Sequence, residues 1–542
     1  MAGGTVPTGR VATRLRGLVL VAGLGLFLAA WVGANPPGAA PDEAAHLVKA
    51  VGTAMGEGIG RPTAAAPTTA SLRDRFITQN TRSFALPRAI RPDPRWACEA
   101  FTTQSASCLN TAPPQQSGRG GGRSVSIVGL YPEPSYLPIG LAARLGGSPD
   151  AALYAGRAAG AVVCLLLLGL AVFAFAEGWL LVGLLVVTSP MVLFLAGSVT
   201  TSGIEVCAGI AQAATVLALL RRSNDRGLWL AYALSGVALA LTRQFGPIFV
   251  LADLGVAAGL LGWSGARTAV RTGGRVALGS LTTVGIAAVA TIGWDAIALP
   301  TVVPSLDIVV HQLRPALSQS YRSLPQLFGV FGWVDTKPPA LTSGLALAIS
   351  ALVVVMGLAV GTRRQRLVLA LSVAATAVGA VLIDAVTQLP FGFGLQVRYV
   401  MPLTAMTLLI AAWLVHERIG ARRLPARVVP SLLSAVLVGE LGVAWLANAR
   451  QAAVGAVGPR LFFRNPQWSP PGGWTMWIFI AALAGLVLLA VVCLPRNAVE
   501  PGSSVPVELF GHGLRRRPVG GAGRVAHEER HTPRSDKRGH RR

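Results

Sequence analysis

Two carboxylates and a histidine stand close together near the start of the chain, in the segment PDEAAH at residues 41–46. Its proline suits the first turn of a helix, so we expect a helix from there to about Met55. Asp42 and His46 are then four residues apart and Glu43 and His46 three apart, which places all three on one helical face. Such a carboxylate can act as a general base. The simpler alternative is that both acids only favour a helix N-terminus.

The composition indicates a membrane protein. Of 542 residues, 52% are apolar and only 13% are charged, whereas about a quarter of a soluble protein is charged. A net charge of +24 would suggest nucleic-acid binding in a soluble chain. Here the basic residues flank apolar segments, so no nucleic-acid partner is expected. The high Ala, Gly and Arg content is typical of GC-rich, actinobacterial genomes.

Twelve apolar segments predict an all-α polytopic bundle of about 12 transmembrane helices. The first also resembles a secretory signal, but its length of about 17 residues and the many similar segments after it favour a retained anchor. The fifth and sixth are short and have the alternative of one crossing plus a re-entrant piece. The segments are 17–33, 152–175, 178–196, 203–220, 228–242, 244–263, 276–298, 341–361, 367–389, 397–415, 428–447 and 474–495.

Arginines are concentrated on alternate short linkers, which predicts a plasma-membrane protein with both termini in the cytoplasm and its active face outside. The last segment is basic and poor in large apolar residues, so we expect it to be disordered. A flexible linker is expected at Gly118–Gly122. The predicted organisation is a basic N-terminus at 1–16, a first crossing at 17–33, an outer loop with a juxtamembrane helix at 34–151, crossings two to seven at 152–298, an outer loop at 299–340, crossings eight to twelve at 341–495 and a cytoplasmic tail at 496–542.

Two of the five cysteines, Cys98 and Cys108, lie together in the first polar loop. If that loop is extracytoplasmic, we expect a disulfide between them. The alternative is two free thiols.

Five short motifs follow one another along the chain. They are PDEAAH at 41–46, YP at 131–132 with YLP at 136–138, LYAGR at 153–157, GVFGWVD at 329–335 and QVRYVMP at 396–402. In this order, from about residue 15 to 480, they resemble the motifs of a bacterial family of predicted membrane proteins with a domain of unknown function. That family is grouped with the C-type (GT-C) glycosyltransferases, and the large first outer loop is similar to theirs.

The chain departs from the family pattern at two places. Where the family often has an Asn-Pro-Asp-like sequence, residues 200–203 read TTSG, and Glu205 is the nearest acid. Val397 stands where a glycine usually precedes the arginine of the last motif. The first departure removes an outer carboxylate and puts activity in doubt more than fold.

The resemblance implies transfer of a sugar from a polyprenyl-phosphate donor to an envelope glycan or glycolipid at the outer membrane face. Asp42 is then expected to be the base, and Glu43 to orient the acceptor or help bind a metal. The cofactor is undetermined; for a divalent cation, Mg²⁺ or Mn²⁺, the candidate ligands are His46 and Glu205. Otherwise His46 is a structural hydrogen-bond partner of the acid pair.

The leaving lipid phosphate requires fixed cations at the membrane surface. Arg243 and Arg398 are the first candidates, with snorkelling anchors as the alternative. The alternative for Trp333 is that it is only an aromatic residue at the membrane interface. The alternative for Asp335 is an ion pair with Lys337. The full set of candidate substrate or phosphate-binding residues is Arg398, Arg243, Arg157, Lys337, Gln396, Tyr399, Trp333 and Asp335.

Two rival functions remain open. A transporter of an envelope precursor would use acids in or near the apolar segments. A non-catalytic envelope scaffold or glycolipid-binding protein would explain the departure at residues 200–203. The acids in question are Glu205, Asp253, Asp295, Asp384 and Glu440.

Overall fold

The computed structural model describes residues 8–63, 69–111, 122–298, 302–394, 396–419 and 425–493. Within these ranges the chain is mostly helical and has one small sheet. This agrees with the predicted class, a helical polytopic membrane protein. The predicted tail at 496–542, and the predicted linker at 118–122 except for Gly122, lie outside the described residues.

Eight helices in the described ranges are long and apolar enough to cross a bilayer. A bent pair, α6 (Gly178–Val187) and α7 (Pro190–Ala196), would add a ninth crossing; its two helices meet at 58°. The eight are α1 (Thr8–Ala34), α5 (Pro149–Phe175), α8 (Thr201–Leu219), α10 (Gly246–Ala298), α13 (Ala340–Val360), α14 (Arg363–Ile383) with the turns that follow it, α16 (Pro425–Val454) and α17 (Gly473–Cys493).

The count of twelve crossings stays a prediction, for three reasons. Helix α9 (Arg226–Thr242) has 17 residues, which is short for a 30 Å hydrocarbon core. Helix α10 spans two predicted crossings, and its geometry is non-helical at Gly262 and Gly274. Helix α15 (Met401–Ile419) ends in His416, Glu417 and Arg418 and is not among the eight.

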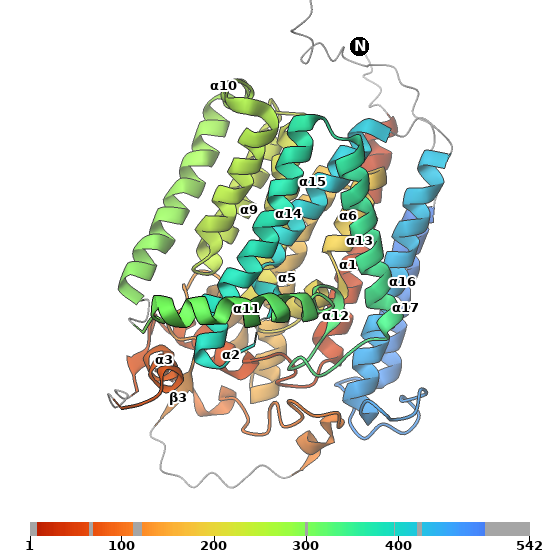
Figure 1. Ribbon diagram of the computed structural model, residues 1–542. Helices are drawn as coiled ribbons and strands as arrows, with labels where there is room; N and C mark the ends of the chain where they lie inside the picture. Colours follow the sequence, from red (N-terminus) through yellow and green to blue (C-terminus); the bar gives the residue numbers. More distant parts are fainter. Residues whose placement is uncertain are drawn as a thin grey trace, which may run out of the picture. The chain divides into compact units, whose positions relative to one another are not determined.

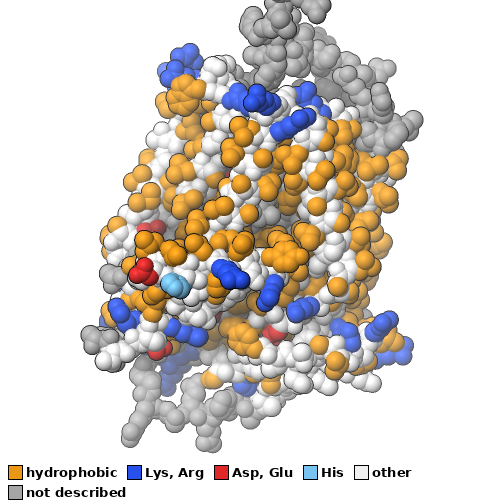
Figure 2. Space-filling model, viewed as in Figure 1, with side chains coloured by type: hydrophobic (Ala, Val, Ile, Leu, Met, Phe, Trp, Pro, Cys, Tyr) orange, Lys and Arg blue, Asp and Glu red, His pale blue; other side chains and the backbone are white. Residues whose placement is uncertain are grey.

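The long helices pack against one another in neighbouring pairs (Figure 1), among them α9 with α10, α8 with α9, and α1 with α17. On the face shown in Figure 2, hydrophobic side chains cover the middle of the bundle, and basic side chains gather toward its ends. This distribution is that of a surface in contact with lipid. Helix α11 (Leu306–Arg322) crosses the long helices near one end of the bundle (Figure 1).

Between α1 and α5 the chain folds into short elements, which we call the outer unit after the outer loop predicted for these residues. Its sheet has the order β1-β2-β3 and is antiparallel, with Arg82 opposite Ser126. The elements are α2 (Glu43–Ala54), β1 (Arg61–Pro62), α3 (Leu72–Asn80), β2 (Arg82–Ala85), η1 (Arg88–Ile90), η2 (Ala106–Asn110), β3 (Arg123–Ser126) and α4 (Leu137–Ala143). Later short elements are α12 (Gln326–Gly329), η3 (Asp384–Gln388), η4 (Leu389–Phe391) and η5 (Val397–Tyr399).

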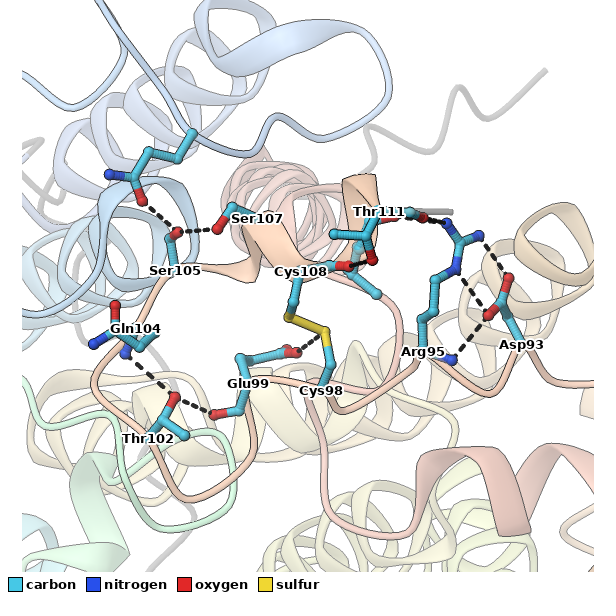
Figure 3. Close-up of a disulfide and its surroundings, with 12 residues drawn as sticks. Asp93, Arg95, Cys98, Glu99, Thr102, Gln104, Ser105, Ser107, Cys108 and Thr111 are labelled. Atoms are coloured by element: carbon cyan, nitrogen blue, oxygen red, sulfur yellow. Dashed lines mark hydrogen bonds and ion pairs between the residues drawn. A yellow bond between two sulfur atoms is a disulfide. The ribbon is translucent and has the colours of Figure 1, made fainter. Parts of the chain in front are cut away.

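The predicted disulfide is confirmed. Cys98 and Cys108 are bonded, with their Cα atoms 6.2 Å apart. The bond closes a short loop in the outer unit that carries Glu99, Thr102 and Gln104 (Figure 3).

The predicted juxtamembrane helix is present as α2, but it begins at Glu43 rather than Pro41. Asp42 is the residue before the helix, with a left-handed φ of 62°. Its side chain therefore does not share the helical face of Glu43 and His46. Helix α4 packs tightly on α2. The approach is so close that a Cβ at Gly140 would lie 1.9 Å from the carbonyl oxygen of Ala50, so glycine is required there.

We predict that Gly140→Ala lowers the free energy of unfolding by about 1–3 kcal/mol, because the added methyl group must push α4 away from α2. The matched control is Gly147→Ala, since a Cβ at Gly147 meets nothing within 4 Å. The measurement is the apparent unfolding midpoint of the purified protein in detergent. Equal midpoints for both variants would contradict this packing.

Candidate functional site

Glu43 and Arg157 form a completely buried ion pair. Glu43 Oε2 accepts a hydrogen bond from Arg157 Nη2 at 2.6 Å, and Glu43 Oε1 accepts one from Arg157 Nε at 2.8 Å. Both side chains have 0% exposure. Glu43 also accepts backbone N–H groups from Gly38 at 3.1 Å and Val199 at 2.9 Å. One carboxylate thus joins the loop before α2, helix α5 and the turn before α8.

The remaining N–H groups of Arg157 hold the end of α1. They donate to the carbonyl oxygens of Val32 at 3.3 Å, Asn35 at 2.7 Å and Pro36 at 2.8 Å. Together with the two bonds to Glu43, these contacts use all five guanidinium N–H groups. Arg157 has no donor left for a phosphate and lies away from water, so the expected contact with a lipid head group does not fit this structure.

A second cluster surrounds Arg243, which follows α9. Its Nη1 donates to Glu205 Oε2 at 3.2 Å and lies 3.4 Å from Ser202 Oγ, and its Nη2 donates to the Tyr131 hydroxyl at 3.3 Å. The guanidinium group lies 5.2 Å from the ring centre of Tyr131 and 4.6 Å from that of Tyr399. Cation–π contacts of this kind are favourable. Arg243 is only 6% exposed, so the alternative of a snorkelling anchor is wrong for it.

Arg398 completes this cluster from η5. It is 6% exposed, and its guanidinium group lies 5.5 Å from the ring centre of Tyr399. Over the described part of the chain, no carboxylate lies within salt-bridge distance of it, and its buried Nε has no hydrogen-bond partner. Arg398 is therefore also not a snorkelling anchor. It is a buried cation with an unused Nε donor, in contrast to Arg157.

The Asp42 carboxylate belongs to the same cluster. It is partly buried, and no hydrogen bond to it occurs among the described residues. Burial raises the pKa of Asp42 above its ordinary value, and the nearby positive charge of Arg398 offsets part of that shift. Asp42 also lies close enough to Tyr136 and Tyr399 to act on their pKa values. The structure thus brings Asp42, Arg243 and Arg398 together around three tyrosines.

His46 is buried beside this cluster. Its Nδ1 is hydrogen-bonded to the Tyr136 hydroxyl at 2.7 Å, not to Asp42 or Glu43 as we expected. Burial lowers the pKa of His46 well below its usual value, and the charges of Arg398 and Arg243 lower it further. His46 is therefore neutral at pH 7.

The residues present do not fit a divalent cation at the candidate ligands. His46 is bonded to Tyr136, and Glu205 is paired with Arg243. In the described ranges, the trio with ligand atoms close enough for a metal is Cys98, Glu99 and Cys108. Its two sulfur atoms are bonded to each other, so neither is a thiolate ligand.

The other predicted site residues, Trp333, Asp335, Lys337 and Gln396, form no hydrogen bond or ion pair with the arginines of the cluster within the described chain. Trp333 donates its indole N–H to the Gly38 carbonyl oxygen at 3.1 Å. Asp335 accepts a hydrogen bond from the Phe101 backbone at 2.8 Å, and the alternative of an ion pair with Lys337 is not among the salt bridges of the described residues. Lys337 is exposed, and Gln396 leads into η5.

Sequence reasoning missed several members of the site. Tyr131 and Tyr136 were noticed as motif residues suited to the membrane interface and not as site residues, although they contact Arg243 and His46. Ser202 stands in the segment that departs from the family pattern, and its hydroxyl lies beside Arg243. Polar residues next to a predicted membrane surface were the available signal for all three.

We predict opposite stability effects for the two adjacent acids. Glu43→Gln leaves Arg157 buried without its counter-ion, which costs about 3–5 kcal/mol of unfolding free energy. Asp42→Asn removes a partly buried carboxylate that accepts no hydrogen bond, so it leaves stability unchanged or slightly higher. The apparent unfolding midpoint in detergent measures both. A larger loss for Asp42→Asn than for Glu43→Gln would contradict the assignment.

A family model described as "Predicted membrane protein (DUF2142)" matches residues 24–407 of the chain. This range contains all five sequence motifs, the outer unit and every member of the Arg243 cluster. No curated protein and no solved structure is similar enough to the chain to match it. The family description agrees with the apolar helices that dominate the fold. The chain therefore belongs to the DUF2142 family of predicted membrane proteins.

Proposed function

We propose that this protein is a membrane glycosyltransferase of the GT-C type that transfers a sugar from a polyprenyl-phosphate donor to a hydroxyl group of an envelope glycan or glycolipid. The observation that carries the proposal is Arg398, a buried guanidinium group without an ion pair, next to Arg243 and the free carboxylate of Asp42.

A phosphate group is the natural partner of this cluster. A buried cation without an acceptor is costly, because its desolvation is not compensated. Guanidinium groups bind phosphate through paired hydrogen bonds. Arg243 already has Glu205 as a counter-ion, whereas Arg398 does not. We assign the phosphate of the donor to Arg398, with Arg243 as the second cation.

The chemical step needs a base and a stabilised leaving group. Asp42 takes the proton of the acceptor hydroxyl as its oxygen forms a bond to the anomeric carbon of the sugar. The bond between that carbon and the phosphate oxygen breaks, and the lipid phosphate leaves with the electron pair. Arg398 and Arg243 stabilise the negative charge that develops on it. Burial around Asp42 raises its pKa, which makes it a stronger base than an exposed aspartate.

The proposed setting is the plasma membrane, with both termini in the cytoplasm and the cluster on the outer face. The distribution of arginines between linkers supports this orientation. The proposed partners are membrane lipid, the polyprenyl-phosphate sugar and the envelope acceptor. No step described here depends on a metal.

A second candidate is a glycolipid-binding protein without catalysis. The observation that favours it is the polar segment at residues 200–203, where Thr200 only caps α8 and Ser202 contacts Arg243. Of the two carboxylates in the cluster, Glu205 is paired with Arg243, so Asp42 alone has neither a hydrogen bond nor an ion pair within the described chain. Both candidates use the arginines to bind a lipid phosphate, and they differ in whether Asp42 is needed.

We predict that Asp42→Asn lowers sugar transfer by at least about 100-fold, because the variant has no base. The measurement is incorporation of radiolabelled sugar from a panel of polyprenyl-phosphate sugars into envelope material, with membranes at matched expression. The control is Asp307→Asn, which removes an exposed carboxylate on α11. Transfer by the wild type that Asp42→Asn retains would contradict the role of Asp42. A variant that rescues a deletion strain without any transfer would favour the second candidate.

We also predict a pH dependence. Asp42 must be deprotonated to act, so the transfer rate falls as the pH drops through its raised pKa, and the acidic limb lies above the range of an ordinary aspartate. The free energy of unfolding changes in the opposite direction. Asp42 binds its proton more tightly in the folded state than in the unfolded state, so its contribution to stability declines as the pH rises through the raised pKa. Rate and unfolding midpoint are measured against pH. An acidic limb at the ordinary value of 3.8 would contradict the buried base.

A further inference from the structure

A pocket opens beside the loop that precedes α2. It contains about 360 Å³ of empty space, including open solvent. Three regions far apart in the sequence meet there: the disulfide-closed loop of the outer unit, the motif at 329–335 and helix α16. The lining residues are Pro36, Ala39, Glu99, Thr102, Gln104, Gly332, Trp333, Asp335, Thr336, Asn448, Gln451 and Ala452.

Two carboxyl groups line this pocket. Glu99 Oε1 is buried and has no hydrogen-bond partner in the described residues. Burial, with further contributions from the charges of Asp335 and Glu43, raises the pKa of Glu99 to about 7. Asp335 is held in place by the Phe101 N–H at 2.8 Å and the Thr336 hydroxyl at 3.1 Å. A carboxyl group titrating near pH 7 both donates and accepts hydrogen bonds.

The rest of the lining consists of an indole ring, amide and hydroxyl side chains, and four residues without polar side chains, Pro36, Ala39, Gly332 and Ala452. The bond from Trp333 to Gly38 fixes the indole. Asn448 is 7% exposed and donates to Asn35 Oδ1 at 2.7 Å. Gln451 of α16 donates to the backbone carbonyl oxygens of Thr102 at 3.5 Å and Gln104 at 3.4 Å (Figure 3 shows Thr102 and Gln104 on the loop next to Glu99). This combination of few polar groups around an aromatic surface is typical of small-molecule sites.

We propose that this pocket binds one sugar unit of the acceptor, with Glu99 and Asp335 hydrogen-bonded to its hydroxyl groups and Trp333 against its ring. This inference rests on the proposed transferase function, because it names the acceptor side of that reaction. Pro36 and Ala39 of the pocket belong to the loop that ends at Asp42. An acceptor held here lies along the same loop that carries the base.

A sugar fits the pocket better than a cation does. A divalent cation needs ionised carboxylates, and Glu99 is only partly ionised at pH 7. Neutral amide and hydroxyl groups supply the donors and acceptors that sugar hydroxyls require, and the flat indole packs against the C–H groups of a sugar ring.

The test is a binding assay that does not depend on catalysis. Full-length protein in nanodiscs is applied to an array of bacterial envelope oligosaccharides, with and without EDTA. We compare the wild type with Glu99→Gln, Trp333→Phe, Asp42→Asn and the exposed control Asp307→Asn. Because Glu99 Oε1 has no partner, Glu99→Gln is expected to fold, and the unfolding midpoint checks this.

The expected result is saccharide binding by the wild type, the Asp307→Asn control and Asp42→Asn, weakened about tenfold in Glu99→Gln. Trp333→Phe weakens it as well. Binding by Asp42→Asn separates this inference from the proposed function, because that variant cannot catalyse transfer. No binding by the wild type, binding unchanged in Glu99→Gln and Trp333→Phe, or binding lost in EDTA would each overturn direct contact between the pocket and a sugar.

Discussion

The buried ion pair between Glu43 and Arg157 is the contact on which the rest of the site depends. It joins the end of α1, the loop before α2, helix α5 and the turn before α8. Its hydrogen bonds are fully satisfied, which is the condition under which a buried ion pair is tolerated. Because Glu43 is fixed, the residue before it has little conformational freedom. The backbone of Asp42 is held in the left-handed conformation, with its carboxylate near Arg398. Glu43 holds the loop through its hydrogen bonds, whereas the Asp42 carboxylate accepts none within the described chain.

The three buried arginines show how one residue type serves different ends. Arg157 uses every donor inside the protein, Arg243 is shared between Glu205 and Tyr131, and Arg398 has no ion-pair partner in the described chain. A protein that only needed stability would gain from an acceptor at Arg398, since unpaired buried charge is unfavourable. Such local costs are typical of sites that bind a ligand. This comparison, more than the resemblance of the motifs, supports binding of a phosphate.

Much of this architecture was predictable from the sequence, because composition and spacing within one helix are local properties. The helical membrane class, the helix after Pro41 and the disulfide followed from such patterns, and so did the choice of Asp42, Arg243 and Arg398 as candidate site residues. The division of labour between Asp42 and Glu43 did not, since it depends on Arg157, 114 residues from Glu43. Contacts between distant segments also determine the partner of His46 and the pocket with Glu99. The position of Asp42 before α2, instead of within its first turn, was not predicted either. The two non-helical glycines of α10, Gly262 and Gly274, lie close to the gap between the predicted segments 244–263 and 276–298.

The most direct test is an experimental structure of the full-length protein in nanodiscs with a polyprenyl phosphate. We predict that the phosphate lies against Arg398 and Arg243, with the Asp42 side chain facing it and the Glu43–Arg157 pair unchanged. A phosphate bound elsewhere on the protein, with Arg398 still without an anionic partner, would contradict the central claim.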